Sequence, residues 1–299
     1  MSLAEVRVPA SCANLGPGFD SFAVAVRRHL TVRVAERADD RVTTTGDRVT
    51  TTGEGARELP TDDGNLVWRA LVAYCEWAGE PVPDVSLAVD NAIPLERGLG
   101  SSAAAAVAGL ALGRALTSGP GRDQEMIDLA ASFEGHADNA AAAVLGGLVV
   151  VSGGRAHRLE PADRLMPVMC VPTDRQATEV ARGLLPETVP LADAAANGAR
   201  AALVLAGLSG AMALHPAAMT DVLHEPARLA AMPGSGALVA GLRNRRIAAC
   251  LSGAGPTVLA IVAAGDQDAL AAVRDLAADQ PFAVTVSDWD RAGATTSGR

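Results

Sequence analysis

Apolar residues recur at helical or alternating spacing along most of the chain, and two glycines near the middle interrupt this pattern. Before Gly153 and Gly154, the spacing predicts strands at 22–34, 85–92 and 147–152 and helices at 65–79, 101–116 and 123–133, with a polar loop after the last helix. After them, it predicts strands at 167–172, 248–252, 257–262 and 282–286 and helices at 192–212, 216–223 and 266–278. Apart from the inserted helices, the second part follows a β-α-β-β-α-β order, which indicates a ferredoxin-like sheet with helices on one side.

These elements predict an α+β protein with two domains, and 299 residues are enough for both. The segment DRVTTTG is repeated in tandem at 40–46 and 47–53, and its threonines and Gly-Asp junction predict a surface hairpin. The last residues are small and polar, which favours a disordered tail. The predicted boundaries are 1–154 for an N-terminal mixed α/β domain, 155–290 for a C-terminal ferredoxin-like domain and 291–299 for the tail.

The basic residues exclude several large classes of protein. All 25 of them are arginine, and the chain contains no lysine. A Walker A loop and a protein kinase each need a lysine at the phosphates, and pyridoxal enzymes and Schiff-base aldolases need a lysine amine. The net charge of -9 also disfavours a nucleic acid partner, because binding to a phosphate backbone requires a concentrated basic surface.

Neither the cysteines nor the apolar stretches point to an extracellular or membrane protein. The N-terminal residues lack the basic and apolar regions of a secretory signal. The longest apolar stretches, 103–113 and 140–151, are shorter than the roughly 20 residues that a membrane helix needs. We therefore expect a soluble cytoplasmic protein without a membrane partner. Widely spaced cysteines without a CxxC pair favour reduced thiols over disulfides or a zinc site; they are Cys12, Cys75, Cys170 and Cys250.

The segment PLERGLGSSAA at 94–104 carries the strongest chemical signal in the chain. Gly98 and Gly100 allow a tight turn without a Cβ in the way of an approaching anion. Ser101 and Ser102 follow at the expected start of a helix, where free N–H groups and the helix dipole favour phosphate. Their hydroxyls could bond phosphate oxygens or ligate Mg²⁺. A plain strand-to-helix turn with serine caps is the alternative.

This segment resembles the signature loop of the GHMP kinases, and two further segments resemble the other motifs of that family in the same order. They are PASCANLGPGFD at 9–20 and LSGAGPT at 251–257, and the first is most similar to the motif of the homoserine kinases. The resemblance covers nearly the whole chain except the repeated segment and the tail. It implies the two-domain GHMP kinase fold with an ATP-binding N-terminal domain, and it implies ATP and Mg²⁺ as cofactors.

The resemblance also implies an activity. Homoserine kinases transfer phosphate from ATP to the side-chain hydroxyl of L-homoserine and form O-phospho-L-homoserine in threonine biosynthesis. The expected partner is therefore L-homoserine, and a homodimer is compatible with the sequence without being required by it. Two alternatives stay open. One is another GHMP kinase that acts on mevalonate or a sugar, and the other is a non-catalytic regulator on the same fold that senses ATP and an amino acid.

For the nucleotide, the resemblance implies contacts from the glycine-serine segment and from Asn65, which matches a stretch that contacts adenine. A helix N-cap is an equal alternative for Asn65. Glu134, in the segment EGHADN, is implied as a Mg²⁺ ligand together with Ser101 and Ser102, because carboxylate, hydroxyl and phosphate oxygens suit this ion. The expected cofactor-binding residues are Asn65, Pro94, Leu95, Glu96, Arg97, Gly98, Leu99, Gly100, Ser101, Ser102, Ala103 and Ala104.

For the amino acid, the resemblance implies a pocket of charged and amide side chains. Asp20 is expected to bind the ammonium, and Arg182 and Arg228 to grip the carboxylate. Asn14, Asp20 and Asn139 would aim the hydroxyl at the γ-phosphate, and no Asp–Lys dyad can form without lysine. The alternatives are Asx-turn caps at Asn14 and Asp20 and a structural role for His136. The expected substrate contacts are Asn14, Asp20, His136, Asp138, Asn139, Thr178, Arg182, Arg228, Gly253 and Gly255, and the residues assigned to catalysis are Asn14, Asp20, Glu134, Asn139 and Arg182.

Overall fold

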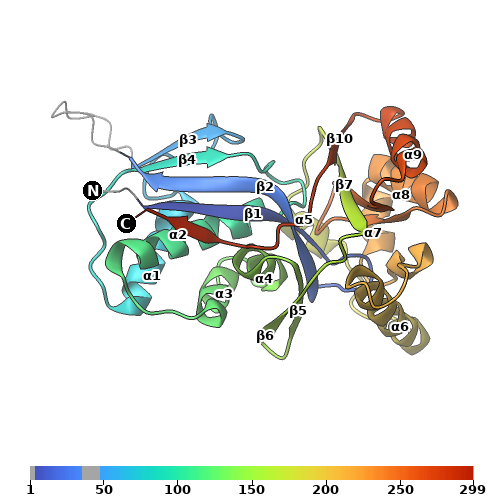
Figure 1. Ribbon diagram of the computed structural model, residues 1–299, viewed down its shortest axis with the longest axis horizontal. Coiled ribbons are helices and arrows are strands. Elements are labelled where there is room, and N and C mark those ends of the chain that lie inside the picture. The colour runs from blue at the N-terminus through green and yellow to red at the C-terminus, as the bar shows by residue number, and fades with distance from the viewer. Residues whose placement is uncertain (1–3, 36–47, 299) are drawn as a thin grey trace.

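The computed structural model describes residues 4–35 and 48–298 and contains two β-sheets, one in each half of an elongated molecule (Figure 1). The first sheet has seven strands, and β1 and β2 form its centre. The strand order is β11-β1-β2-β4-β3, and β5 extends the sheet by pairing with β2 and β6. The strands are β1 (Glu5–Ala13), β2 (Phe22–Val34), β3 (Val49–Gly53), β4 (Leu87–Asn91), β5 (Leu148–Ser152), β6 (Arg155–Leu159) and β11 (Thr295–Ser297).

Helices cover one face of this sheet (Figure 1). The first of them, α1, begins and ends as its sequence predicts, because the Asn65 side chain accepts the Val67 N–H at 3.0 Å and Gly79 takes a left-handed φ of 70°. The second, α2, is buried on nearly all sides, which agrees with its run of alanines. The helices are α1 (Leu66–Ala78), α2 (Ser101–Thr117), α3 (Asp123–Ala131) and α4 (Asp138–Leu145).

Small residues allow α1 and α2 to pack closely. A Cβ added to Gly109 of α2 would lie 2.1 Å from the carbonyl oxygen of Val67 in α1. We therefore expect Gly109→Ala to lower the free energy of unfolding by ~1–3 kcal/mol, the usual cost of overpacking a core. The measurement is the urea unfolding midpoint. Gly198→Ala, in a helix where an added Cβ meets nothing within 4 Å, is the control and is expected to gain up to about 1 kcal/mol from helix propensity. Equal shifts in both variants would contradict close helix packing.

The second sheet has the predicted ferredoxin-like arrangement, with the antiparallel order β10-β7-β9-β8. Because side chains alternate along a strand, its two faces differ. Val168 and Cys170 point to the face covered by α8 and α9, whereas Met169 and Val171 join the core of the first domain. The sheet is therefore buried on both faces. Its elements are β7 (Leu165–Pro172), β8 (Ala248–Leu251), β9 (Val258–Ala263), β10 (Phe282–Val286), α8 (Pro233–Asn244) and α9 (Gln267–Ala278).

The inserted segment between β7 and β8 holds α5 (Thr178–Gly183), α6 (Leu191–Leu208), the 3₁₀ helix η1 (Pro216–Met219) and α7 (Glu225–Ala231). The predicted helix at 216–223 is thus a short 3₁₀ turn. The helix does not continue, because the Asp221 carboxylate accepts the backbone N–H groups of the residues that follow Asp221. These hydrogen bonds favour the start of a new helix, α7. The polar loop expected after 133 is also shorter than predicted, because α4 begins at Asp138.

Two predictions about segment boundaries differ from the structure. β6 pairs with β5, so the first sheet extends through Leu159 rather than ending at 154. The tail at 291–299 was predicted to be disordered, but β11 within it pairs with β1. This pairing satisfies the backbone groups of β1, which would otherwise be the edge of the sheet. The Asp290 carboxylate holds the tail in place by accepting the N–H groups of Ala292 and Gly293 and bonding His29 at 2.8 Å.

The tandem repeat is described only in part. Its first copy, at 40–46, lies outside the described residues, so the predicted hairpin stays a prediction. The second copy supplies β3, which pairs in parallel with β4. Within the described ranges, every cysteine is buried and free, as expected for reduced thiols, and burial raises the pKa of Cys12 to about 11. None of the helices in these ranges is both long and apolar enough to cross a membrane.

Candidate active site

Three loops far apart in the sequence meet at one cleft between the two sheets. They are the first loop (residues 14–21), the glycine-serine loop (94–102) and the third loop (252–257), which correspond to the three motif segments. The N–H of Ser11 donates to the carbonyl of Leu99 at 3.1 Å, and the Ser252 hydroxyl donates to the carbonyl of Gly98 at 2.7 Å. The glycine-serine loop is thereby held from both sides.

The glycines of the glycine-serine loop are needed for this packing. Gly98 and Gly100 have φ values of 72° and 66°, which a residue with a Cβ rarely adopts. An added Cβ would lie 2.1 Å from the Ser252 carbonyl oxygen at Gly98 and 2.1 Å from the Ser11 hydroxyl at Gly100. The loop therefore presses against its neighbours and aims the N-terminus of α2 into the cleft, where its N–H groups favour an anion.

The cleft opens to solvent and offers about 720 Å³ of space, and a second, more apolar pocket adjoins it. The two share Glu96, Ser101 and Ser102, so the N-terminus of α2 lies between them. Asn65 and Leu95 line the apolar pocket rather than the cleft. The predicted residues that line the cleft are Asn14, Asp20, Pro94, Glu96, Arg97, Gly98, Leu99, Gly100, Ser101, Ser102, Glu134, His136, Asp138, Asn139, Thr178, Arg182, Arg228 and Gly253.

Three predicted site residues lie elsewhere. Ala103 and Ala104 of α2 are fully buried and line neither pocket. Gly255 is absent from the cleft wall, and a Cβ there would meet Met232 and Leu251 at less than 3 Å. Helix periodicity and the turn at Gly255 direct these positions into the protein, so their predicted ligand contacts stay predictions.

Glu134 is the carboxylate best placed to hold a metal ion. It follows α3 and lies beside Ser102, and burial raises its pKa. Its Oε2 atom is buried and has no hydrogen-bond partner among the described residues. An unsatisfied buried oxygen of this kind is costly unless a cation or water takes it up. The same ranges hold no group of three or more His, Cys, Asp or Glu side chains placed to hold a metal ion, so an ion here would draw its other ligands from hydroxyls, water and a ligand's phosphates. The donor set therefore fits Mg²⁺.

The segment that follows Glu134 orients an imidazole and an amide in the cleft. The Asp138 carboxylate bonds His136 Nδ1 at 2.7 Å, and this contact raises the pKa of His136. The same carboxylate accepts the N–H of Asn139, and the Asn139 side-chain oxygen accepts the Ser11 hydroxyl at 2.8 Å. The orientation of Asn139 is thus set by its oxygen, which leaves its amide N–H groups for the cleft.

The opposite wall of the cleft carries the charges expected for an amino acid. Arg182 of α5 donates two hydrogen bonds to the Asp20 carboxylate, at 2.9 and 3.0 Å. The side chain of Arg228, from α7, is buried, and both guanidinium groups lie over the ring of Phe19, at 5.7 Å for Arg182 and 5.4 Å for Arg228. The side chains predicted to bind the ammonium and the carboxylate of an amino acid therefore lie together. Two of them, Asp20 and Arg182, neutralise each other.

Several predicted site residues also have structural contacts. Asn14 accepts the N–H of Asp20 and donates to the Gly253 carbonyl at 2.9 Å, so it joins the first and third loops. Asn65 serves as the N-cap of α1 and donates to Pro60. Arg97 donates to three backbone carbonyls, including that of Pro172 at 2.9 Å, and thereby ties the glycine-serine loop to β7.

Several residues that sequence analysis did not identify support the cleft from outside its wall. Ser11 and Ser252 stand within the first and third motif segments, and their hydroxyls join these segments to Asn139 and to the glycine-serine loop. The ring of Phe19 lies under the guanidinium groups of two arginines. Because aromatic residues make up only 3% of the chain, a phenylalanine within a motif segment could have drawn attention to this position. Asp221 and His224 form a buried group behind Arg228, and the histidine could have been found from its place in the segment HEPAR.

The chain is similar to known proteins in both sequence and fold. The profile of the GHMP kinases N terminal domain matches residues 65–147. A homoserine kinase of Streptomyces avermitilis is 43% identical over 274 residues, which cover 89% of this chain and 88% of that protein. A homoserine kinase of Mycolicibacterium smegmatis is 45% identical over 273 residues, 86% of this chain and 84% of that protein. The crystal structure of homoserine kinase from Cytophaga hutchinsonii matches with a TM-score of 0.82 at 25% identity, over 99% of this chain and 97% of that one. The chain belongs to the homoserine kinase family of the GHMP kinases.

Proposed function

We propose that the protein transfers the γ-phosphate of ATP to the side-chain hydroxyl of L-homoserine and releases ADP and O-phospho-L-homoserine. The observation that carries this proposal is that Asp20, Arg182 and Arg228 line the same cleft as the glycine-serine loop. A zwitterionic amino acid needs one acidic and one or two guanidinium groups, and a triphosphate needs the N–H groups of a helix N-terminus. The cleft offers both sets of groups side by side.

The nucleotide would occupy the two adjoining pockets. Its adenine would enter the apolar pocket near Asn65, and its phosphates would lie along the glycine-serine loop at the start of α2. Glu134, Ser101 and Ser102 would hold Mg²⁺, which when bound neutralises charge on the phosphates. The Asp138 carboxylate raises the pKa of His136, so this contact favours the protonated imidazole in a cleft that has no lysine.

Homoserine would enter between the first loop and α5. Its carboxylate would take guanidinium hydrogen bonds from Arg182 and Arg228, and its ammonium would take the place of Arg182 at Asp20. The amide of Asn139 would then orient the hydroxyl toward the γ-phosphate. Since phosphoryl transfer passes through a loose transition state, positioning and charge neutralisation supply most of the rate. A strong general base is not required for this arrangement.

The test of this function is ADP release by the whole chain with Mg²⁺ and ATP and one of four alcohols. We expect release with L-homoserine and a background rate with mevalonate, galactose and shikimate, because these three lack an ammonium to pair with Asp20. Turnover of mevalonate or galactose in preference to homoserine would identify another GHMP activity. ATP and homoserine binding without any ADP release would identify a regulator.

The setting of the reaction also belongs to this proposal. The relatives' name implies a step of threonine biosynthesis, and we propose the same step for this chain. A cytoplasmic location and a homodimer stay predictions.

A further inference from the structure

We propose that His224 is a positioning residue that holds the guanidinium of Arg228 in place for the amino-acid carboxylate, acting as a neutral imidazole protonated on Nε2. This inference rests on the proposed function, because it gives Arg228 a carboxylate to bind. His224 itself does not line the cleft. Its effect would reach the substrate only through Arg228.

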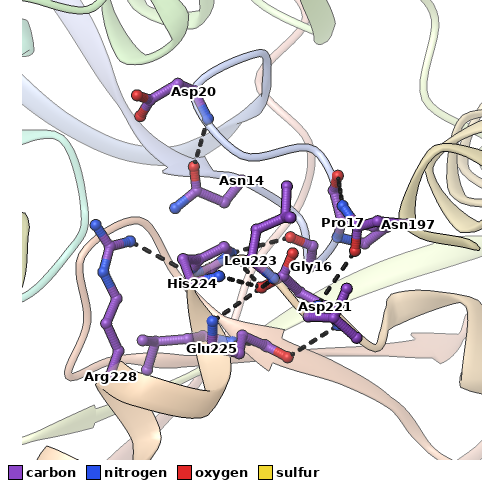
Figure 2. A network of polar contacts seen from close by, with 12 residues as sticks. Asn14, Gly16, Pro17, Asp20, Asn197, Asp221, Leu223, His224, Glu225 and Arg228 are labelled. Atoms are coloured by element: carbon purple, nitrogen blue, oxygen red, sulfur yellow. Dashed lines mark hydrogen bonds and ion pairs between the residues drawn. The ribbon is translucent and has the colours of Figure 1, made fainter. Parts of the chain in front are cut away.

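Figure 2 shows His224 between Arg228 and the first loop. On one side, Nη1 of Arg228 lies 3.3 Å from His224 Nδ1. On the other, His224 Nε2 lies 3.0 Å from the carbonyl oxygen of Gly16. The imidazole ring also stacks on Phe19, with ring centroids 5.3 Å apart. One side chain thus joins the arginine, the backbone of the first loop and the aromatic platform.

The partners of the two ring nitrogens determine where the proton lies. A guanidinium only donates, so Nδ1 must accept from Arg228, and a carbonyl only accepts, so Nε2 must donate to Gly16. A doubly protonated ring would have no acceptor for Arg228 and would place a second cation beside it. Burial lowers the pKa of His224, although Asp221 and Glu225 act against this effect, and the lowered pKa agrees with a neutral ring.

Contacts around Arg228 leave one of its nitrogens for the cleft. Nε donates to the carbonyl of Ala181 at 3.3 Å, and Nη1 donates to Gly253 at 3.2 Å as well as to His224. Within the described residues, Nη2 makes no hydrogen bond, and Arg228 lines the cleft. The fork is therefore held at Nε and Nη1, and Nη2 is the nitrogen left for a carboxylate. The contact to His224 fixes the plane of this fork.

A buried acidic group holds His224 from behind (Figure 2). The Asp221 Oδ2 atom accepts the backbone N–H of Leu223, His224 and Glu225, at 2.9, 2.6 and 2.9 Å. Glu225 in turn accepts the N–H of Leu251 at 2.9 Å and pairs with Arg243 at 2.6 Å. Since His224 is fully buried within this network, its ring has little freedom to turn. This network therefore holds the His224 ring in position and takes no part in the chemical step.

Two amide variants, each with a polar atom near the position of one ring nitrogen, separate the two contacts of the ring. His224→Asn keeps an acceptor at the position of Nδ1 and loses the donor to Gly16, whereas His224→Gln keeps a donor at the position of Nε2 and loses the acceptor for Arg228. Both lose the ring stacked on Phe19, so this loss cancels in their comparison. We expect the KM for L-homoserine to be about tenfold higher in His224→Gln than in His224→Asn, since hydrogen bonds to charged groups are worth a factor of this size. The KM for ATP should be the same in both.

The control is His157, an exposed histidine on β6, where Asn and Gln variants are expected to match the wild type in both KM values. Equal homoserine KM values in the two His224 variants, or parallel increases in the KM for ATP, would show a merely structural role and overturn the inference. Failure of the proposed function is distinguishable, because the wild-type chain would then release no ADP with homoserine at all.

A measurement on the wild-type protein covers the case in which the variants do not fold. Imidazole nitrogen spectra recorded by ¹H–¹⁵N NMR should show His224 as the neutral Nε2–H tautomer at neutral pH, with the Nδ1 signal shifting when L-homoserine is added. A doubly protonated ring, the Nδ1–H tautomer, or an Nδ1 signal that does not respond to homoserine would each overturn the inference.

Discussion

Replacing Glu134 by Gln is expected to lower kcat by about 100-fold or more while leaving the affinity for L-homoserine within about twofold. Removing one stabilising group from a developing charge commonly costs a factor of this size. The amide keeps the shape of the side chain but removes the negative charge that would hold Mg²⁺, and the described residues include no group of three His, Cys, Asp or Glu side chains placed to hold the ion instead. The Oε2 atom of Glu134 has no hydrogen-bond partner among the described residues, so its replacement by an amide nitrogen removes the oxygen that is available to the ion. Steady-state kinetics and homoserine calorimetry measure the two quantities.

The magnesium dependence makes this test specific. In Glu134→Gln, the concentration of Mg²⁺ needed for half-maximal rate should rise, and excess Mg²⁺ should restore part of the activity. Glu76→Gln, on the exposed face of α1, removes the same charge away from the cleft and should behave as the wild type. If Glu134→Gln retains turnover within a fewfold at low Mg²⁺, the metal assignment is wrong.

The parts of the fold that could be predicted are those whose signals are local. Helix α1 was predictable at both ends because Asn65 caps it and Gly79 ends it. The second domain was predictable because its strands are short apolar runs and α9 has a clear apolar face. In contrast, α4 consists of DNAAAAVL, and because its alanines give no periodicity, the pattern does not predict a helix there. The strand β11 has three residues and depends on an edge nearly the whole chain away, which no local pattern reveals.

The candidate site shows the same division. The three motif segments identified most of the cleft wall, because each carries its glycines and polar groups within a few residues. Their mutual contacts could not be predicted, since Ser11 and Asn139 are 128 positions apart and Ser252 and Gly98 are 154 apart. For the same reason, the pairing of Asp20 with Arg182 was not foreseen, although each was expected to bind a charge of the substrate. Sequence identified the groups, and only the fold showed which of them neutralise one another.

Replacing Asp20 by Asn is expected to raise the KM for L-homoserine by about 10- to 100-fold, because the ammonium loses its counter-charge in a partly desolvated cleft. Asn at this position keeps the size of the side chain and the backbone N–H that Asn14 accepts, so the loop geometry should be preserved. The variant also ends the competition between Arg182 and the ammonium for one carboxylate. Arg182 then becomes free to bind the carboxylate of a ligand that has no ammonium.

A substrate that lacks only the ammonium makes this argument decisive. 4-Hydroxybutyrate has the carboxylate and the hydroxyl of homoserine, and the wild type should strongly prefer homoserine in kcat/KM. In Asp20→Asn most of that preference should disappear. The kcat/KM for homoserine should fall, whereas the kcat/KM for 4-hydroxybutyrate should stay the same or rise. Asp275→Asn, an exposed change on α9, is the control and should keep the full preference. A preference that survives in Asp20→Asn would mean that another group binds the ammonium, and the salt bridge between Asp20 and Arg182 would then serve to anchor α5 to the first loop.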